Sequence, residues 1–333
     1  MSEQEVVRPA PSFDKRRVFL TGANGFIGRT LAARLRELGG TVAGVDLIAD
    51  PDNGIEAGST ADPSQWAHAL AGADAVVHLA AIVSTVAPVD KAWEVNVLGT
   101  KKVIDAAVDA GVSRFVHLSS IAAYGWEFPD HVTETYPTRV TGGVSTYVDT
   151  KTNSEQVVFA NSHRGMETVV IRPGDVYGPG SVWIREPIAM AKANQLVLPN
   201  GGSGVFDMIY VDNLVDGIVL ALTTQGISGE IFNITEDQGV SNAAYFGEIA
   251  SWVGGKFRSV PIGIGLPAVG VAGKALRRLG KRSELGPGML HMLNREHLVS
   301  NEKARKVLGF QPVVSYREGI ARCREWAQDE NLI

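Results

Sequence analysis

Short apolar runs that alternate with longer amphipathic stretches constrain this fold more than any other feature of the sequence. Each run is almost continuously apolar, as expected of a parallel strand covered on both faces: RVFLT (17–21), TVAGVD (41–46), AVVHLA (75–80), RFVHLSS (114–120) and ETVVIRP (167–173). Between the runs lie stretches with helical periodicity, at 26–38, 63–71, 91–110 and 146–162. Strand and helix in alternation predict an α/β fold with right-handed crossovers, built on a doubly wound parallel sheet.

The second half of the chain departs from this alternation after Pro173. Loops rich in Gly and Pro interrupt short helical stretches, and a last helix is expected at 316–329. We therefore expect a flexible N-terminal tail over residues 1–15 and a sheet domain over residues 16–175. Residues 176–333 should form a smaller, mostly helical subdomain that caps the sheet and is interleaved with its last strands.

The composition excludes several classes of protein. The 333 residues carry a formal net charge of −5, which argues against sequence-independent binding of nucleic acid. The single cysteine, Cys323, excludes an intrachain disulfide framework and a cysteine-cluster metal site, which fits a reducing cytoplasm. No apolar run approaches the roughly 18 residues that span a bilayer, and no signal-peptide pattern opens the chain. We expect a cytoplasmic enzyme without a metal.

A glycine-rich turn, TGANGFIG (21–28), follows the first predicted strand and opens the first predicted helix. Gly22 permits the sharp turn, Gly25 lets the backbone approach a pyrophosphate, and Gly28 lets helix and strand pack closely. The helix N-terminus then presents free N–H groups to the phosphates. A glycine triplet alone is compatible with an ordinary tight turn. At the first strand-to-helix junction of an alternating chain, it indicates a Rossmann-type dinucleotide site.

The end of the second predicted strand indicates which dinucleotide binds. The carboxylate of Asp46 can accept both hydroxyls of the adenosine ribose and would repel a 2′-phosphate. Leu47 and Ile48 follow, with no Arg or Lys nearby. The sequence therefore favours NAD over NADP. The adenine is expected beside one of three residues further along the chain: Ser59, Thr60 or Asp62.

A candidate catalytic pair lies in STYVDTK, at the start of the helix predicted over 146–162. Tyr147 and Lys151 are four residues apart and so share one helical face. An ammonium about 4 Å from the phenol is worth roughly 4 kcal/mol, or about three pKa units, which would make Tyr147 a usable acid/base. Such pairs often arise by chance on a surface. Ser120 adds weight, because it ends a strand at the carboxyl edge and could hold a substrate oxygen.

These motifs resemble the extended short-chain dehydrogenase/reductases of the NAD-dependent epimerase/dehydratase superfamily. The matching segments follow the family's order and cover roughly residues 17–330: TGANGFIG (21–28), VVHLAA (76–81), NVLGT (96–100), HLSSIAAYG (117–125), YVDTK (147–151) and IRPGDVYGPG (171–180). The resemblance implies a Ser–Tyr–Lys mechanism, in which Lys151 also bonds the nicotinamide ribose. Ser120, rather than Ser119, matches the catalytic hydroxyl because it stands five residues before Gly125.

The resemblance also implies a set of cofactor contacts and an oligomer. The cofactor contacts expected from the motifs are Gly22, Asn24, Gly25, Phe26, Ile27, Asp46, Ser59, Thr60, Leu79, Ala80, Ala81, Asn96, Tyr147, Lys151, Pro173, Gly174 and Val176. Members of the family commonly pair the helices that correspond to 91–110 and 146–162, so a homodimer is expected.

Two departures from the family's pattern bear on the substrate. Nucleotide-sugar enzymes usually carry an Arg where this chain has Phe206, and an Asn where it has Asp175. An Arg fork binds a diphosphate, whereas an Asp would repel it. The stretch MIYVDNLVDGI (208–218) resembles instead the 3β-hydroxysteroid dehydrogenase-like branch, which acts on apolar alcohols. Four aromatic residues could line an apolar pocket or simply belong to the core: Trp126, Phe128, Trp183 and Phe206.

We weigh three functions. The first is NAD-dependent oxidation or reduction of a secondary alcohol or ketone on a sterol-like or lipid-like small molecule, with Tyr147 as general acid/base. The second is an NAD-dependent nucleotide-sugar epimerase or dehydratase that uses the same triad. The third, a non-catalytic NAD-sensing regulator, is disfavoured because such proteins often lack the Tyr–Lys pair.

The segment 262–282 is apolar and Gly-rich and carries five basic residues. A solvated helix face is the default interpretation, although the Gly and Pro content makes a regular helix from Ile262 doubtful. The alternative hypothesis is a mobile substrate lid that touches a membrane surface.

Overall fold

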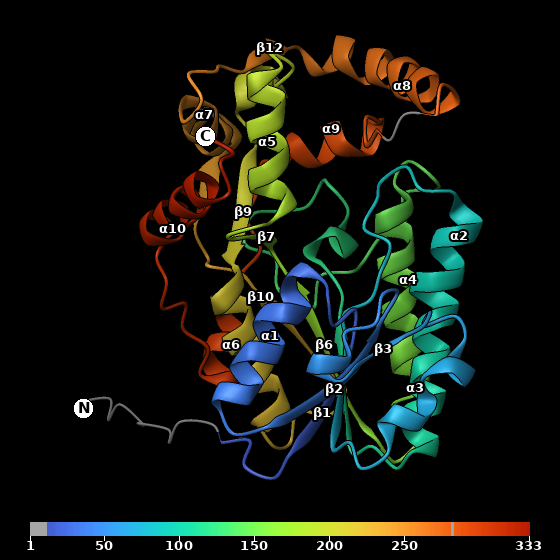
Figure 1. The fold of residues 1–333 in the computed structure, drawn as a ribbon. Helices are drawn as coiled ribbons and strands as arrows, with labels where there is room; N and C mark the ends of the chain where they lie inside the picture. The colour runs from blue at the N-terminus through green and yellow to red at the C-terminus, as the bar shows by residue number, and fades with distance from the viewer. Residues whose placement is uncertain (1–11, 281–282) are drawn as a thin grey trace, which may run out of the picture.

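A seven-stranded parallel sheet forms the centre of the protein (Figure 1). The computed structural model describes residues 12–280 and 283–333. The strand order is β10-β6-β5-β4-β1-β2-β3, and every neighbouring pair is parallel, which confirms the predicted doubly wound sheet. The strands are β1 (Arg17–Thr21), β2 (Thr41–Asp46), β3 (Ile55–Ala57), β4 (Ala75–His78), β5 (Arg114–Leu118), β6 (Glu167–Pro173) and β10 (Glu230–Ile234).

Helices cover both faces of this sheet (Figure 1). On one face lie α1 (Phe26–Glu37) and α6 (Val211–Thr223), whose leucines and isoleucines pack on Val18 and Leu20 of β1. On the other face lie α3 (Gly99–Asp109) and α4 (Thr146–Ala160), which pack on Phe19 of the same strand. Successive side chains of one strand thus enter two separate cores, which explains why the predicted strands are apolar without alternation.

Two of the predicted helical stretches are less regular than expected. The stretch 63–71 forms two short 3₁₀ helices, η2 (Pro63–Gln65) and η3 (Ala67–Leu70). Asp62 caps η2, because its side chain accepts a hydrogen bond from the Ser64 N–H. The stretch 91–110 is divided into α2 (Val89–Trp93), a π-helical turn η4 (Glu94–Leu98) and α3. A third 3₁₀ helix, η1 (Pro51–Asn53), precedes β3, and a fourth, η5 (Ile121–Tyr124), follows β5.

The second half of the chain builds a cap over the carboxyl edge of the sheet (Figure 1). A small mixed sheet joins β7 (Asp175–Tyr177), β9 (Val205–Tyr210) and β11 (Gly239–Ser241), and β8 (Val197–Pro199) pairs with β12 (Arg258–Val260). A further hydrophobic core, with the buried Tyr177, Phe206 and Tyr245, holds these strands to the helices. The remaining elements are α5 (Val182–Lys192), η6 (Asn200–Gly202), α7 (Asn242–Ser251), α8 (Ile262–Arg278), α9 (Pro287–Leu293), η7 (Ala304–Leu308) and α10 (Tyr316–Asp329).

The cap and the sheet domain share secondary structure. Strand β10 lies between β9 and β11 in sequence but pairs with β6 in the central sheet, and α6 packs beside α1. The Gly and Pro content argued against a regular helix from Ile262, and this expectation is wrong, because α8 runs from Ile262 to Arg278. Part of the predicted tail, residues 1–11, lies outside the described residues. Phe13, within the same predicted tail, is buried in the core, and its N–H donates to Leu38 O at 2.9 Å.

Candidate functional site

The glycine turn leaves no room for side chains, as a backbone cradle requires. Gly22 has φ +68°, and a Cβ there would lie 2.9 Å from the backbone N of Ala80. A Cβ on Gly28 would lie 2.3 Å from the carbonyl oxygen of Gly22. Glycine is required at both positions because β1, α1 and the segment after β4 approach one another closely. The turn therefore has the geometry that a pyrophosphate needs.

The N-terminus of α1 offers its first N–H groups without competition from a cap. Gly25 is the N-cap residue, and no side chain caps the helix. Gly25 is exposed, while Phe26 and Ile27 behind it are half-buried. The first N–H groups of this helix are therefore available to an anion.

Asp46 is held in place at the end of β2 by two backbone donors. Its carboxylate accepts the Asn24 N–H at 2.9 Å and the Leu47 N–H at 2.7 Å. The Asn24 side chain donates to Ile48 O at 2.8 Å, which ties the glycine turn to the same loop. The carboxylate is thus positioned beside the turn, and these residues fit a dinucleotide with its adenosine ribose at Asp46.

The segment after β4 forms the wall opposite the glycine turn. The N–H groups of Leu79 and Ala80 both lie 3.2 Å from Thr21 Oγ1, and Ala81 follows half-buried. Asn96 is buried, and its amide exchanges two hydrogen bonds with the backbone of Ile82, at 2.7 and 3.0 Å. Asn96 therefore fixes the course of this wall.

Asn96 also connects the wall to α4. Its Nδ2 donates to Thr150 Oγ1 of α4 at 2.9 Å. Further along, Ser59 is half-buried and Thr60 is buried against Gly99, whereas Asp62 is exposed and caps η2. Pro173 and Gly174 are buried at the end of β6, and Val176 is half-buried on β7.

The structure brings Ser120, Tyr147 and Lys151 together at the carboxyl end of β5. Tyr147 lies in the first turn of α4, which Ser145 caps, and its phenol faces the Ser120 side chain. The Lys151 Nζ lies 5.8 Å from the centre of the Tyr147 ring and donates to Leu118 O at 2.6 Å. Lys151 is only 4% exposed, so α4 and β5 together hold the amine rigidly.

The expected lowering of the Tyr147 pKa by Lys151 is wrong. Burial raises the pKa of Tyr147 to about 12, the hydrogen bond with Ser120 lowers it in part, and the nearby Asp175 raises it. Burial also lowers the pKa of Lys151 to about 8, against the attraction of Glu155. Desolvation of the phenolate outweighs the charge of the amine, which is committed to a backbone carbonyl.

Behind the triad lies a buried polar network that sequence reasoning missed. The carboxylate of Glu155 is fully buried and accepts the Arg172 Nε at 2.8 Å and Nη2 at 2.6 Å. It also accepts the Ser119 hydroxyl, while the Arg172 guanidinium lies 4.6 Å from the centre of the Tyr124 ring. Ser119 is thus committed to this network, whereas Ser120 faces the phenol. A signal was present, because Glu155 follows Lys151 by four residues and shares its helical face.

Two buried histidines, one on β4 and one on β5, stack beneath this site. The rings of His78 and His117 lie 5.4 Å apart, and both are buried. His78 contacts the hydroxyls of Thr21 at 2.6 Å and Thr100 at 3.0 Å. Burial and the charge of Lys151 lower the pKa of His78 to about 3, so both rings stay neutral beside the amine.

A buried cluster of charges lies on the cap side of Tyr147. Arg295, from the segment after α9, forms an ion pair with Asp175 in which the two side chains are 3% and 12% exposed. Asp207 is fully buried: one carboxylate oxygen accepts the Val299 N–H at 2.8 Å and the other has no hydrogen-bond partner. Burial raises the pKa of Asp207 to about 7, while Arg295 lowers it and Asp175 raises it.

This cluster changes the argument drawn from Asp175. The sequence suggested an unpaired carboxylate that would repel a diphosphate, but Arg295, 120 residues further along, neutralises it. The possibility that four aromatic residues line an apolar pocket is also corrected in part. Phe206 stacks on Tyr245 with ring centres 4.0 Å apart, and Phe128 is buried beside Tyr124, so both belong to the core. Trp126 and Trp183 are half-buried.

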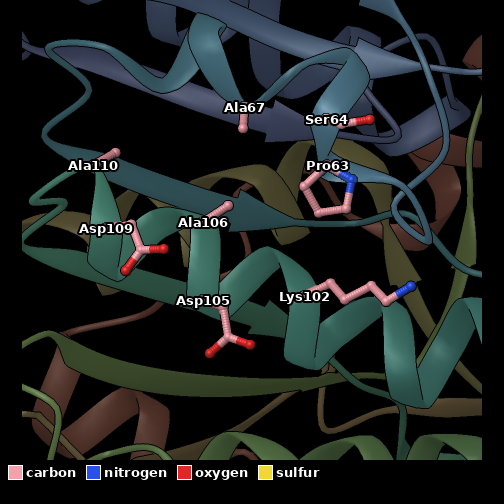
Figure 2. A pocket seen from close by; sticks show the side chains of 8 residues that line it. All are labelled: Pro63, Ser64, Ala67, Lys102, Asp105, Ala106, Asp109 and Ala110. Atoms are coloured by element: carbon pink, nitrogen blue, oxygen red, sulfur yellow. The ribbon is translucent and has the colours of Figure 1, made fainter.

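A hollow of about 450 Å³ on the surface lies away from these residues (Figure 2). It opens between α3 and the two 3₁₀ helices η2 and η3, and its charged lining consists of Lys102, Asp105 and Asp109 on α3. None of the predicted catalytic or cofactor residues lines it. The candidate site is therefore the edge of the sheet around Tyr147, and not this hollow.

The family model described as the NAD dependent epimerase/dehydratase family matches residues 18–235. The chain belongs to this family. It is 29% identical to the 3beta-hydroxysteroid-dehydrogenase/decarboxylase isoform 2 of Arabidopsis thaliana, over 94% of this chain and 62% of that protein, so it spans less than two thirds of that relative. It is 27% identical to the 3-beta-hydroxysteroid dehydrogenase of Mycolicibacterium neoaurum, over 96% of this chain and 94% of that one.

A solved structure of MoeE5 in complex with UDP-glucuronic acid and NAD superposes with a TM-score of 0.77 at 24% identity, over 94% of this chain and 99% of that one. At this identity the likeness shows the fold alone. Family membership and the relatives confirm the predicted extended short-chain dehydrogenase/reductase, its 3β-hydroxysteroid dehydrogenase-like branch and its enzymatic class. Among the residues that the structure describes, no helix is long and apolar enough to cross a bilayer.

Proposed function

We propose that this member of the NAD dependent epimerase/dehydratase family interconverts a secondary alcohol and a ketone on a mainly apolar, sterol-like or lipid-like small molecule. Tyr147 acts as the general acid/base, Ser120 holds the substrate oxygen and Lys151 binds the nicotinamide ribose. The names of the two steroid dehydrogenases above, which match 94% and 96% of this chain, support this substrate class.

The buried ion pair between Arg295 and Asp175 is the observation that carries the substrate class. A nucleotide-sugar enzyme must neutralise a diphosphate, and a free guanidinium does this best. Here the guanidinium is neutralised by Asp175, and the buried Asp207 also acts on it electrostatically. Phe206, where family members that bind a diphosphate carry an Arg, is 2% exposed within the cap core. The cation of this cluster, Arg295, is therefore already paired, which favours a substrate without charge.

The residues of the glycine turn, Asp46 and the wall after β4 would hold NAD with its nicotinamide near Tyr147. NAD, when bound, accepts or supplies the hydride. With a pKa of about 12, the phenol of Tyr147 is protonated at neutral pH. In the direction of ketone reduction it therefore donates this proton to the substrate oxygen without prior activation. Ser120, which faces the phenol, is placed to share that oxygen.

The test is a substrate screen with the full chain. Sterol 3-alcohols, bile-acid-like alcohols, medium-chain secondary alcohols and their ketones are offered beside UDP- and dTDP-sugars, with NAD and NADP in both redox states. We expect a change in the absorbance of reduced cofactor with an apolar alcohol or ketone, and loss of that change in Tyr147→Phe. Turnover of a nucleotide sugar without net NADH would overturn the proposal.

The epimerase or dehydratase alternative rests on the same triad and on the shared fold. It needs a cation that is free for the diphosphate, so it predicts that UDP binds to the protein tightly enough to compete with substrate. Equilibrium dialysis with UDP distinguishes the two functions directly. A homodimer through α3 and α4 remains a prediction that static light scattering tests.

A further inference from the structure

The outer face of α8 is exposed and apolar over its whole length. Only Gly265 and Gly273 of this helix are buried. A Cβ on Gly273 would collide with Leu285 O, and a Cβ on Gly265 would crowd the Leu290 side chain. Glycines thus let α8 lie close to α9 and the segment before it, so that its opposite side faces outward (Figure 1).

The exposed apolar residues of α8, together with Leu279 directly after it, form a stripe. Ile264, Val271 and Leu279 are 66%, 73% and 75% exposed. Ala268 and Ala275 are also exposed. The spacing i, i+4, i+7, i+11 and i+15 places all five along one side of the helix. A continuous apolar stripe of this kind, unlike single exposed residues, is typical of an interaction surface.

The charge around this stripe differs from that of the whole chain. The chain has a net charge of −5, yet residues 262–282 carry five basic residues and no acidic one. Lys274 and Arg278 are exposed and follow Val271 and Ala275 by three residues, so they border the stripe. Arg277 donates instead to Ser283 O and Leu285 O. Lys281 and Arg282 lie outside the described residues.

The neighbourhood of α8 connects this surface to the catalytic helix. Glu284, just after α8, accepts the Ser84 hydroxyl at 2.9 Å and the Thr85 N–H at 3.1 Å, next to the wall after β4. On α9, a Cβ at Gly288 would lie 3.1 Å from Ser145 Cβ, two residues before Tyr147. Helix α8 therefore lies at the end of the cap that adjoins the start of α4.

The segments that meet α8 and α9 there also expose apolar side chains. Val83, beside Ser84, is 70% exposed, and Val144, whose carbonyl lies against Gly288, is 44% exposed. The apolar surface is thus continued on the sheet domain by the loops that lead to the candidate site.

We propose that the outer face of α8 docks on an anionic lipid surface, with the helix in the plane of the headgroups. The apolar stripe enters the boundary with the acyl chains, and Lys274 and Arg278 contact lipid phosphates. The site then opens beside the bilayer, and an apolar substrate can reach it from the lipid. Vesicle binding does not depend on the reaction catalysed, so it can be tested even if the proposed function fails.

The experiment is flotation of the full chain with vesicles of phosphatidylcholine and phosphatidylglycerol at 7:3, and with pure phosphatidylcholine. We expect binding to the anionic vesicles that weakens at least tenfold in Val271→Asp. The matched control is Val313→Asp, because Val313 is 71% exposed beside α6 and should bind as the unchanged protein does.

The basic residues are tested in the same assay. Lys274→Gln with Arg278→Gln should weaken binding about 30-fold, whereas Arg317→Gln with Arg324→Gln on α10 should not. Unchanged thermal unfolding of each variant shows that it is folded. No binding of the unchanged protein to anionic vesicles, or equal loss in Val271→Asp and Val313→Asp, would overturn the proposal. So would a concentration-dependent dimer without lipid that Val271→Asp dissociates, because the face would then bind a second copy.

Discussion

The proposed cofactor end of the candidate site is built from backbone and short local motifs, whereas its proposed substrate end is built from charges that meet across the chain. Gly22, Gly25 and Gly28 lie within seven residues, and Asp46 is held by backbone N–H groups. Asp175 and Arg295 are 120 residues apart and neutralise each other in a buried pair. The first end can be recognised from a motif, but the meaning of a residue at the second end depends on its partner.

The largest effect should follow from the side chain that stands between the two ends. Tyr147→Phe removes the proton donor and should lower kcat roughly 10³–10⁴-fold, because proton transfer of this kind is lost from the transition state. NAD affinity, measured by calorimetry, should change less than about threefold. Tyr136→Phe is the control, since Tyr136 packs on Tyr124 and not on the triad. Retained turnover in Tyr147→Phe would refute its role as acid/base.

A substitution at the substrate end should destabilise the fold more than a substitution at the cofactor end. Arg295→Met leaves Asp175 and Asp207 buried without their cation and should lower the free energy of unfolding by about 3 kcal/mol. Urea denaturation measures this, with Arg324→Met on the exposed face of α10 as control. A loss below about 1 kcal/mol would show that the pair is not the structural feature we describe.

A substitution at the cofactor end should change the selectivity between NAD and NADP. Asp46→Ser removes the carboxylate that would meet the ribose hydroxyls or repel a 2′-phosphate, and should lower the preference for NAD over NADP about 10- to 30-fold. The ratio of kcat/KM for the two cofactors measures it. Asp52→Ser, an exposed acid on η1, should leave the ratio unchanged. An unaltered ratio in Asp46→Ser would remove this carboxylate from cofactor choice.

The smallest effect concerns the pH dependence of the substrate end. Burial raises the pKa of Asp207 to about 7, among the facing groups Arg295, Asp175 and Asp237. Because the folded pKa lies above the unfolded one, Asp207 stabilises the fold below about pH 4, and this contribution is lost as the pH rises through 7. Asp207→Asn should therefore gain stability relative to the unchanged protein between pH 4 and 8, by more than about 1.4 kcal/mol. Urea denaturation of both proteins at several pH values measures this gain. A difference in the free energy of unfolding that stays constant with pH would contradict the prediction.

Local patterns were sufficient to predict the sheet and the meeting of three candidate site residues. The bounds of β1, β2, β6 and α10 match the expected ranges, because continuous apolar runs and a capped amphipathic helix are decided locally. Ser120, Tyr147 and Lys151 also come together as expected, since a strand end and the adjacent helix fix them.

What the sequence did not reveal depends on contacts between distant segments. The regular helix α8 forms although Gly and Pro argue against it, since Gly265 and Gly273 gain close packing against the segments after it. The pKa of Tyr147 is set by burial, which a spacing of four residues does not report. Arg295 has no local motif that marks it as the partner of Asp175.

The return of β10 to the central sheet has a consequence for how this protein is made and inherited. The strand that completes one edge of the sheet is translated only after most of the small sheet of the cap, so the nucleotide half cannot finish folding on the ribosome until residue 234 has emerged. A cut near residue 175 would yield two fragments with open edges rather than two modules. Recombination between relatives is therefore expected to exchange both halves as one unit.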